Sequence, residues 1–137
     1  MEPISILAAI LSIASSVKKL TEDKKMLPQD ALDLFKKDVA SPQQKAFLAD
    51  QINVEGVIST MSISRNLLEQ LLREAEECEN KHVQGRAAAN GIGAKDKVNR
   101  SADQCMCSVL RDVKRYNKSK LPSGPYKAWW DSYGCEK

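Results

Sequence analysis

The stretch Ile4-Ser5-Ile6-Leu7-Ala8-Ala9-Ile10-Leu11-Ser12-Ile13-Ala14-Ser15-Ser16-Val17 contains no charged residue, and the fold of the chain depends on where it is placed. A helix of this composition is apolar nearly all round, as in the centre of a globular core or in contact with lipid. From Pro3 to Val17 the helix rises roughly 22 Å, whereas a bilayer core needs roughly 20 residues. We therefore expect a helix that is buried in a core or that meets a membrane without spanning it easily.

The same stretch carries a row of small residues at helical spacing, namely Ser5, Ala9, Ser12 and Ser16. Small side chains let helices approach closely, both in membranes and in tight bundles. Met1-Glu2-Pro3 is acidic, unlike the basic start of a signal peptide, so we expect no cleavable signal and a retained helix. The residues predicted to act in membrane contact or self-association are Ile4, Ser5, Ala9, Ile10, Ser12, Ile13 and Ser16.

Length and charge indicate one domain, residues 1–137, with two electrically different halves. A chain of 137 residues is large enough for one core. The formal net charge is +3, but residues 1–80 hold 9 Lys/Arg against 13 Asp/Glu, a net of −4, and residues 81–137 hold 12 against 5, a net of +7. A basic half fits nucleic acid, anionic lipid or an acidic partner, and charge alone does not choose among them.

Helix signals are clear in the first half of the chain. The first helix is predicted from Pro3 to about Leu20 and a short second helix from Pro28 to about Ala40. Ser41-Pro42-Gln43-Gln44 predicts a capping box, with Ser as N-cap and Gln three residues later. The helix that follows carries Ala46, Phe47, Ile52 and Val54, and Gly56 marks either a break or a costly but tolerated glycine inside a longer helix.

In the second half, Met61, Leu68, Ala75 and His82 recur every seven residues and predict a long helix from Val57 to His82. Small residues over 85–96 predict a flexible loop, and the last long helix is expected over 97–118. The aromatic, cysteine-containing tail, 121–137, is predicted as a turn followed by a short helix over 126–133, with Gly134 as its C-cap. Since no run alternates with period two, we predict an all-α bundle of five or six helices with a hydrophobic N-terminal helix and a short aromatic C-terminal helix.

The four cysteines allow three pairings. Cys105 and Cys107 point about 200° apart on a helix, which predicts that Cys107 bonds Cys135 while Cys105 meets Cys78. The alternative is that Cys78 and Cys105 are small, buried free thiols. Cys78 and His82, at i and i+4, are weak candidates for a metal site with a later cysteine, but the spacing matches no common zinc finger. We therefore predict no metal and no cofactor.

Catalytic signals are weak throughout. His82 is the only histidine and Cys78 its nearest potential nucleophile, although a solvated or capping histidine is the better explanation near the end of an acidic helix. Glu74, Glu76, Glu77 and Glu79 are interpreted as a solvated helix face rather than a glycosidase pair. Gly91-Ile92-Gly93 lacks the third glycine and the preceding strand of a dinucleotide site. We predict that the protein is not an enzyme.

A basic patch and an aromatic cluster lie in the last third of the chain. The patch is either a solvated helix face or a phosphate-binding surface, for which anionic lipid headgroups fit the apolar N-terminus better than nucleic acid does. The aromatic residues Tyr126, Trp129, Trp130 and Tyr133 either pack the tail onto the core or form an interfacial anchor. The residues of the patch are Arg111, Lys114, Arg115, Lys118 and Lys120.

Met1-Glu2-Pro3-Ile4-Ser5-Ile6, followed by the Ala/Ser/Ile/Leu helix and Lys18-Lys19, resembles the start of the HeLo-like helical domains at the N-termini of fungal cell-death receptors. The resemblance covers about 20 of the 137 residues. It implies a helical bundle whose N-terminal helix takes part in membrane permeabilisation by an oligomer.

Two functional hypotheses follow. The first is a non-enzymatic membrane-active protein, of the pore-forming effector, toxin or virion-penetration type, that self-associates and exposes or inserts Ile4 to Val17. The second is a soluble helical interaction module, such as an adaptor, immunity protein or assembly subunit, with the same helix as its core. Expected partners are another copy or a different protein, together with anionic lipid, whereas nucleic acid is not expected. Localisation stays open between a cytosol, secretion without a signal peptide, and membrane association.

Overall fold

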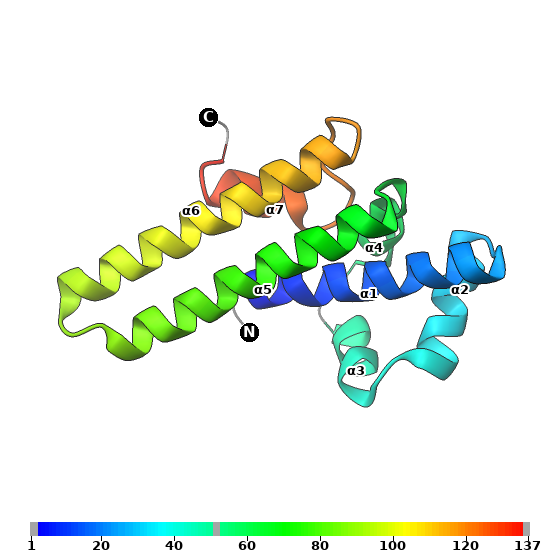
Figure 1. The fold of residues 1–137 in the computed structure, drawn as a ribbon, viewed down its shortest axis with the longest axis horizontal. Coiled ribbons are helices and arrows are strands. Elements are labelled where there is room, and N and C mark those ends of the chain that lie inside the picture. Colours follow the sequence, from blue (N-terminus) through cyan, green and yellow to red (C-terminus); the bar gives the residue numbers. More distant parts are fainter. Residues whose placement is uncertain (1–2, 51–52, 136–137) are drawn as a thin grey trace.

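The computed structural model describes residues 3–50 and 53–135, and these ranges contain helices and turns but no strand (Figure 1). The predicted all-α class is therefore confirmed. The described ranges contain seven α-helices rather than five or six, together with a π-helical and a 3₁₀ segment. The α-helices are α1 (Pro3–Lys24), α2 (Pro28–Leu34), α3 (Pro42–Asp50), α4 (Val54–Ser59), α5 (Arg65–Ala88), α6 (Ile92–Tyr116) and α7 (Tyr126–Ser132).

Helix α1 lies in the core, side by side with α5 and also in contact with α2 and α4 (Figure 1). Leu7, Ile10 and Leu11 have no exposed surface at all. The helix runs one turn beyond the predicted end at Leu20. The residues of this last turn are charged and mostly exposed, so the extra turn adds nothing to the core. It stops where Lys25 adopts a left-handed conformation (φ 52°) and the Met26 amide donates to the Thr21 carbonyl at 3.2 Å.

The two short helices after α1 begin where the sequence predicts. α2 starts at Pro28 and continues into the π-helical segment Phe35–Val39, which ends at Ala40. The capping box before α3 is confirmed: the Ser41 hydroxyl accepts from the Gln44 amide at 3.1 Å, and the Gln44 side chain accepts from the Ser41 amide at 3.0 Å. Of the apolar residues expected on this helix, Phe47 is buried, whereas Ile52 lies outside the described residues.

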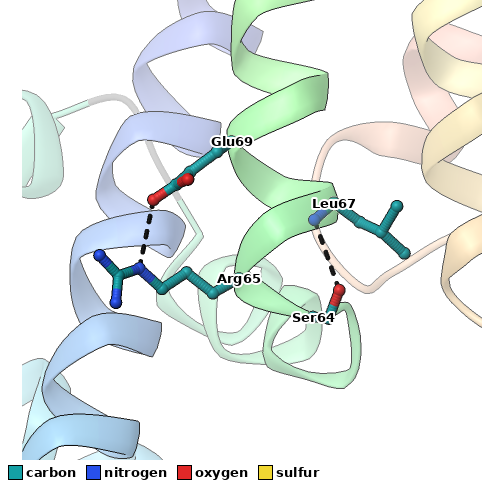
Figure 2. A network of polar contacts seen from close by, with 4 residues as sticks. All are labelled: Ser64, Arg65, Leu67 and Glu69. Carbon is teal, nitrogen blue, oxygen red and sulfur yellow. Dashed lines mark hydrogen bonds and ion pairs between the residues drawn. The ribbon is translucent and has the colours of Figure 1, made fainter.

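The predicted single helix from Val57 to His82 is wrong at its start, which explains the additional helix. α4 ends at Ser59 and a 3₁₀ turn, Thr60–Ser62, follows. α5 then starts anew because the Ser64 hydroxyl accepts from the Leu67 amide at 3.4 Å, and Arg65 forms an ion pair with Glu69 at 3.2 Å (Figure 2). Heptad spacing alone does not reveal this break, since Met61 lies in the 3₁₀ turn and is nevertheless buried.

Gly56 lies inside α4 and is required by a close approach of the chain. A Cβ atom at this position would lie 2.5 Å from the Ser123 carbonyl oxygen and 3.1 Å from the Cα of Gly124. Gly56 is therefore not the break itself, but α4 has only six residues and is not the longer helix of the other interpretation.

The predicted loop over 85–96 is also wrong, because α5 and α6 form a helical hairpin joined by residues 89–91 alone. Ala87 and Ala88 extend α5, in keeping with the high helix propensity of alanine. Gly85 is inside α5, where an added Cβ would lie 3.3 Å from a methyl group of Val98. The glycine lets the two helices approach closely, and Gly91 (φ 86°) makes the turn between them.

The end of this hairpin, residues 81–100, extends past the start of α1 and is named the hairpin tip (Figure 1). The Ser5 hydroxyl near the start of α1 donates to Glu79 of α5 at 2.9 Å, so the cover provided by α1 stops there. Most side chains of the tip are exposed, including Val83 at 58% and Ile92 at 82%. The molecule thus has a packed base and an uncovered two-helix projection.

Replacing Ile10 by Lys is expected to abolish the cooperative fold. Ile10 is fully buried, and an unpaired ammonium in such a site costs several kcal/mol, on the scale of the whole stability of a domain, about 5–15 kcal/mol. Circular dichroism and urea denaturation measure the loss. The matched control is Leu27→Lys at a position that is 71% exposed, where we expect a change within about 0.5 kcal/mol. A folded Ile10→Lys variant would contradict the core placement.

Candidate functional site

Two disulfide bonds organise the second half of the chain, and both are the predicted pairs. Cys78 of α5 bonds Cys105 of α6 with a Cα–Cα distance of 5.9 Å, and Cys107 of α6 bonds Cys135 with a Cα–Cα distance of 5.3 Å. The first bond ties the two helices of the hairpin together just below its tip. The second attaches the tail to the outer side of α6.

The helix end before Cys135 is a Schellman motif that aims this cysteine at α6. The Cys135 amide donates to the Trp130 carbonyl at 3.0 Å and the Gly134 amide donates to Asp131 at 3.3 Å, with Gly134 left-handed at φ 65°. α7 packs through Tyr126, which is fully buried, and Trp130, which is 8% exposed. Burial raises the pKa of the Tyr126 hydroxyl above its ordinary value, so this group stays neutral.

Beside the first disulfide, α5 and α6 enclose a cavity of about 240 Å³ that contains His82. Cys78 is bonded to Cys105, so this thiol is neither a metal ligand nor a nucleophile for His82 in the oxidised protein. The described ranges contain no cluster of three His, Cys, Asp or Glu residues able to hold a metal ion. The residues lining the cavity are Cys78, Lys81, His82, Gly85, Val98, Ser101, Ala102 and Cys105.

The acidic residues of α5 do not form one solvated face, as the sequence suggested. Glu76 and Glu77 are exposed, and Glu77 pairs with Lys81 at 3.1 Å. Glu74 instead lies between the helices, where one carboxyl oxygen is buried without a hydrogen-bond partner in the described part of the chain. Burial, followed by a hydrogen bond with Asp112 and the charge of Asp112, raises the pKa of Glu74 from 4.5 to about 7.

Three of the five residues predicted as a basic patch meet in one place. Arg111, Lys114 and Arg115 line a shallow cavity of about 220 Å³ with Ser119 and Trp130, which we name the basic pocket. The Lys114 ammonium lies 4.9 Å from the centre of the Trp130 ring, a cation–π contact that ties the cation to the tail. Lys118 and Lys120 do not line the pocket; both are exposed beyond the end of α6.

Arg115 is the best-anchored cation of the basic pocket. Its Nη2 atom donates to the Tyr116 hydroxyl at 2.9 Å and lies 3.4 Å from Asp112, and these partners raise the pKa of its guanidinium further above its ordinary value. Neither Arg111 nor Lys114 forms an ion pair with an acidic side chain among the described residues. The pocket therefore has an excess of positive charge.

The residues predicted for membrane contact or self-association lie in and around the core. Ile4, Ile10 and Ile13 are buried, and the four small residues Ser5, Ala9, Ser12 and Ser16 are half-buried. By length and composition, one helix in the described ranges, Ile4–Lys24, would be able to cross a membrane. In this fold, however, its large apolar side chains face other helices.

Comparison with protein-family models, with curated proteins and with solved structures returned no match to this chain. The resemblance of the N-terminal residues to HeLo-like domains consequently stays a prediction. The function has to be argued from the hairpin tip, the basic pocket and the core.

Replacing Glu74 by Gln is expected to remove a pH dependence of stability. Because the pKa of Glu74 is about 7 in the fold against 4.5 ordinarily, the folded state keeps a proton that the unfolded chain releases, and the free energy of unfolding falls as pH rises between these values. The variant should be more stable than the parent above pH 7 by about 1 kcal/mol, after allowance for solvent around the pair. Urea denaturation at about pH 5 and about pH 8 measures both proteins.

The matched control for this change is Glu76→Gln, because Glu76 is exposed on the same helix. It should leave the pH profile of stability as it is in the parent. A parent protein whose stability does not fall between these two pH values would contradict the placement of Glu74.

Removing the second disulfide with Cys107→Ser and Cys135→Ser is expected to lower the free energy of unfolding by about 3 kcal/mol, since the bond closes a loop of 28 residues in the unfolded chain. Urea denaturation measures this loss. Peptide mapping of the oxidised parent should recover Cys78 linked to Cys105 and Cys107 linked to Cys135. Thiols that alkylate before reduction, or a Cys105–Cys107 bond, would refute the pairing.

Proposed function

We propose that the chain is a non-enzymatic helical interaction protein, stabilised by disulfides, that binds an acidic protein surface through its hairpin tip. The observation that carries this proposal is the placement of α1. Its apolar side chains are buried against α5, α2 and α4, which supports the interpretation of this helix as the core of an interaction module. The surface left for binding is then on the other elements.

The hairpin tip has the properties of a recognition surface. It stands clear of α1 and presents Val83 and Ile92 to solvent. Residues 81–100 contain five Lys/Arg and one Asp, a net charge of +4, which complements an acidic surface and speeds encounter with it. The Cys78–Cys105 bond at its base holds the two helices in register, so less conformational entropy is lost when a partner binds.

The disulfides also bear on where the protein acts. Bonds of this kind form and persist in oxidising spaces, such as the outside of the cell or a secretory compartment. Two disulfides in a chain of this length favour action in such a space, reached with or without a recognised signal. The partner would then be an extracellular or compartment-lumen protein, or a second copy of the chain.

A photo-crosslinking residue placed at Ile92 tests the proposed partner surface. We expect a specific adduct in the native surroundings of the protein, because Ile92 is 82% exposed at the apex of the tip. Adding Lys95→Glu and Lys97→Glu should reduce the yield by about tenfold, since like charges across an interface cost affinity. Mass spectrometry of the adduct identifies the partner, and twice the mass of the chain identifies a second copy.

The matched control places the same photo-crosslinker at Lys19, an exposed position on α1 far from the tip. Circular dichroism checks that the charge-reversal variant stays folded. The proposal fails if adducts form equally at positions 19 and 92, or if reversing the charges leaves the yield unchanged.

Membrane activity of α1 is the second candidate function, favoured by the length and apolar composition of Ile4–Lys24. It would require α1 to leave the core and to insert, alone or as an oligomer, with local thinning of the bilayer. Leakage of dye from vesicles by the parent protein, lost in a folded Ile10→Lys variant, would support this candidate over the interaction module.

A further inference from the structure

A second binding site is indicated toward the other end of α6 from the hairpin tip, where α7 lies against α6. We propose that the basic pocket binds the phosphate group of a phosphomonoester, either a soluble molecule or a lipid headgroup. This inference is independent of the proposed partner of the hairpin tip. It rests on the charges, the anchoring and the size of the pocket.

The charges of the pocket match a phosphate dianion. Arg111, Lys114 and Arg115 follow one another at i, i+3 and i+4, so they share one face of α6. Asp112 and Glu74 both act on Arg115, so the local net charge is +2 with Glu74 protonated and +1 with Glu74 ionised. Arg115 uses one guanidinium nitrogen, Nη2, for Asp112 and Tyr116, and its other N–H groups remain for the planar, two-point contacts that arginine makes with phosphate.

The wall of the pocket is held in place by the second disulfide and by the turn that follows α6. The Cys107–Cys135 bond fixes α7, and with it Trp130, against α6. Ser119 lines the pocket from a turn in which Lys118 and Ser119 are both left-handed, at φ 57° and 64°. Such conformations are uncommon for residues other than glycine; here, as at Lys25 after α1, they turn the chain at a helix end, and they place Ser119 beside the pocket.

The volume of the basic pocket and the contact of Lys114 with the Trp130 indole restrict the class of ligand. A volume of about 220 Å³ is below the 300–1,000 Å³ usual for pockets that enclose whole small molecules, so it suits a headgroup. Lys114 covers one face of the Trp130 ring, and the residue as a whole is only 8% exposed, so Trp130 offers no open face on which a nucleobase would stack. A phosphate on a small or a lipid carrier is therefore favoured over nucleic acid.

Tryptophan fluorescence provides the test. In a Trp129→Phe background, Trp130 is the one remaining tryptophan of the chain and reports on its own pocket. Inorganic phosphate and glycerol phosphate are titrated in solution, and co-sedimentation is measured with vesicles of phosphatidic acid in phosphatidylcholine and of phosphatidylcholine alone. We expect saturable binding that Arg111→Gln with Arg115→Gln weakens by about tenfold or more, because charge-assisted hydrogen bonds are lost.

The control variant Lys19→Gln with Lys45→Gln removes two exposed charges from other helices and gives the same net charge. It should bind as the parent does, and circular dichroism should show both double variants folded. Saturation with soluble phosphate supports a free phosphomonoester, and binding only to phosphatidic acid vesicles supports a lipid headgroup. The proposal is overturned if neither probe binds, or if both double variants weaken binding equally.

Discussion

The burial of α1 is the constraint on which the rest of the structure depends. A helix without charge from Ile4 to Val17 has to be covered on most sides, and one neighbour cannot do this. α5 covers the largest part, and the short helices α2 and α4 complete the cover. α1 is shifted along α5, with Ser5 beside Glu79 and Lys18 beside Met61, before the start of α5. The cover therefore ends near Glu79, and the hairpin continues into solvent.

The first disulfide sets the register of that hairpin. Cys78 lies opposite Cys105, and Gly85 lies opposite Val98; both pairs have their midpoint between residues 91 and 92, where the chain turns. The same register places Glu74 of α5 beside Asp112 of α6. The pairing of α5 with α6 therefore determines both the disulfide and the contact between the two carboxyl groups. The second disulfide adds α7 to the outer face of α6 and thereby completes the basic pocket.

Local patterns in the sequence were sufficient for much of the fold and for less of the site. The capping box at Ser41 and the divergence of Cys105 from Cys107 are properties of a few neighbouring residues, and both predictions were confirmed. The small residues around the hairpin turn predict a long loop, which is wrong. Gly85 is there to let α5 approach Val98 of α6, and this contact between two helices cannot be inferred from the neighbouring sequence. Likewise the pKa of Glu74 is raised by burial between the helices and by Asp112, 38 positions later. Both depend on how α5 and α6 pair, which the sequence around Glu74 does not show.

The carboxyl pair and the basic pocket are linked through Asp112 and Arg115. The positive charge of Arg115 lowers the pKa of Glu74, while Asp112 raises it and also pairs with Arg115. An anion bound to Arg115 offsets that positive charge, so it raises the pKa of Glu74 further. By reciprocity, protonation of Glu74 must strengthen binding of the anion by the same factor. Since the pKa of Glu74 is about 7, this coupling acts near neutral pH, down to about pH 6, where a phosphomonoester itself takes up a proton and loses charge.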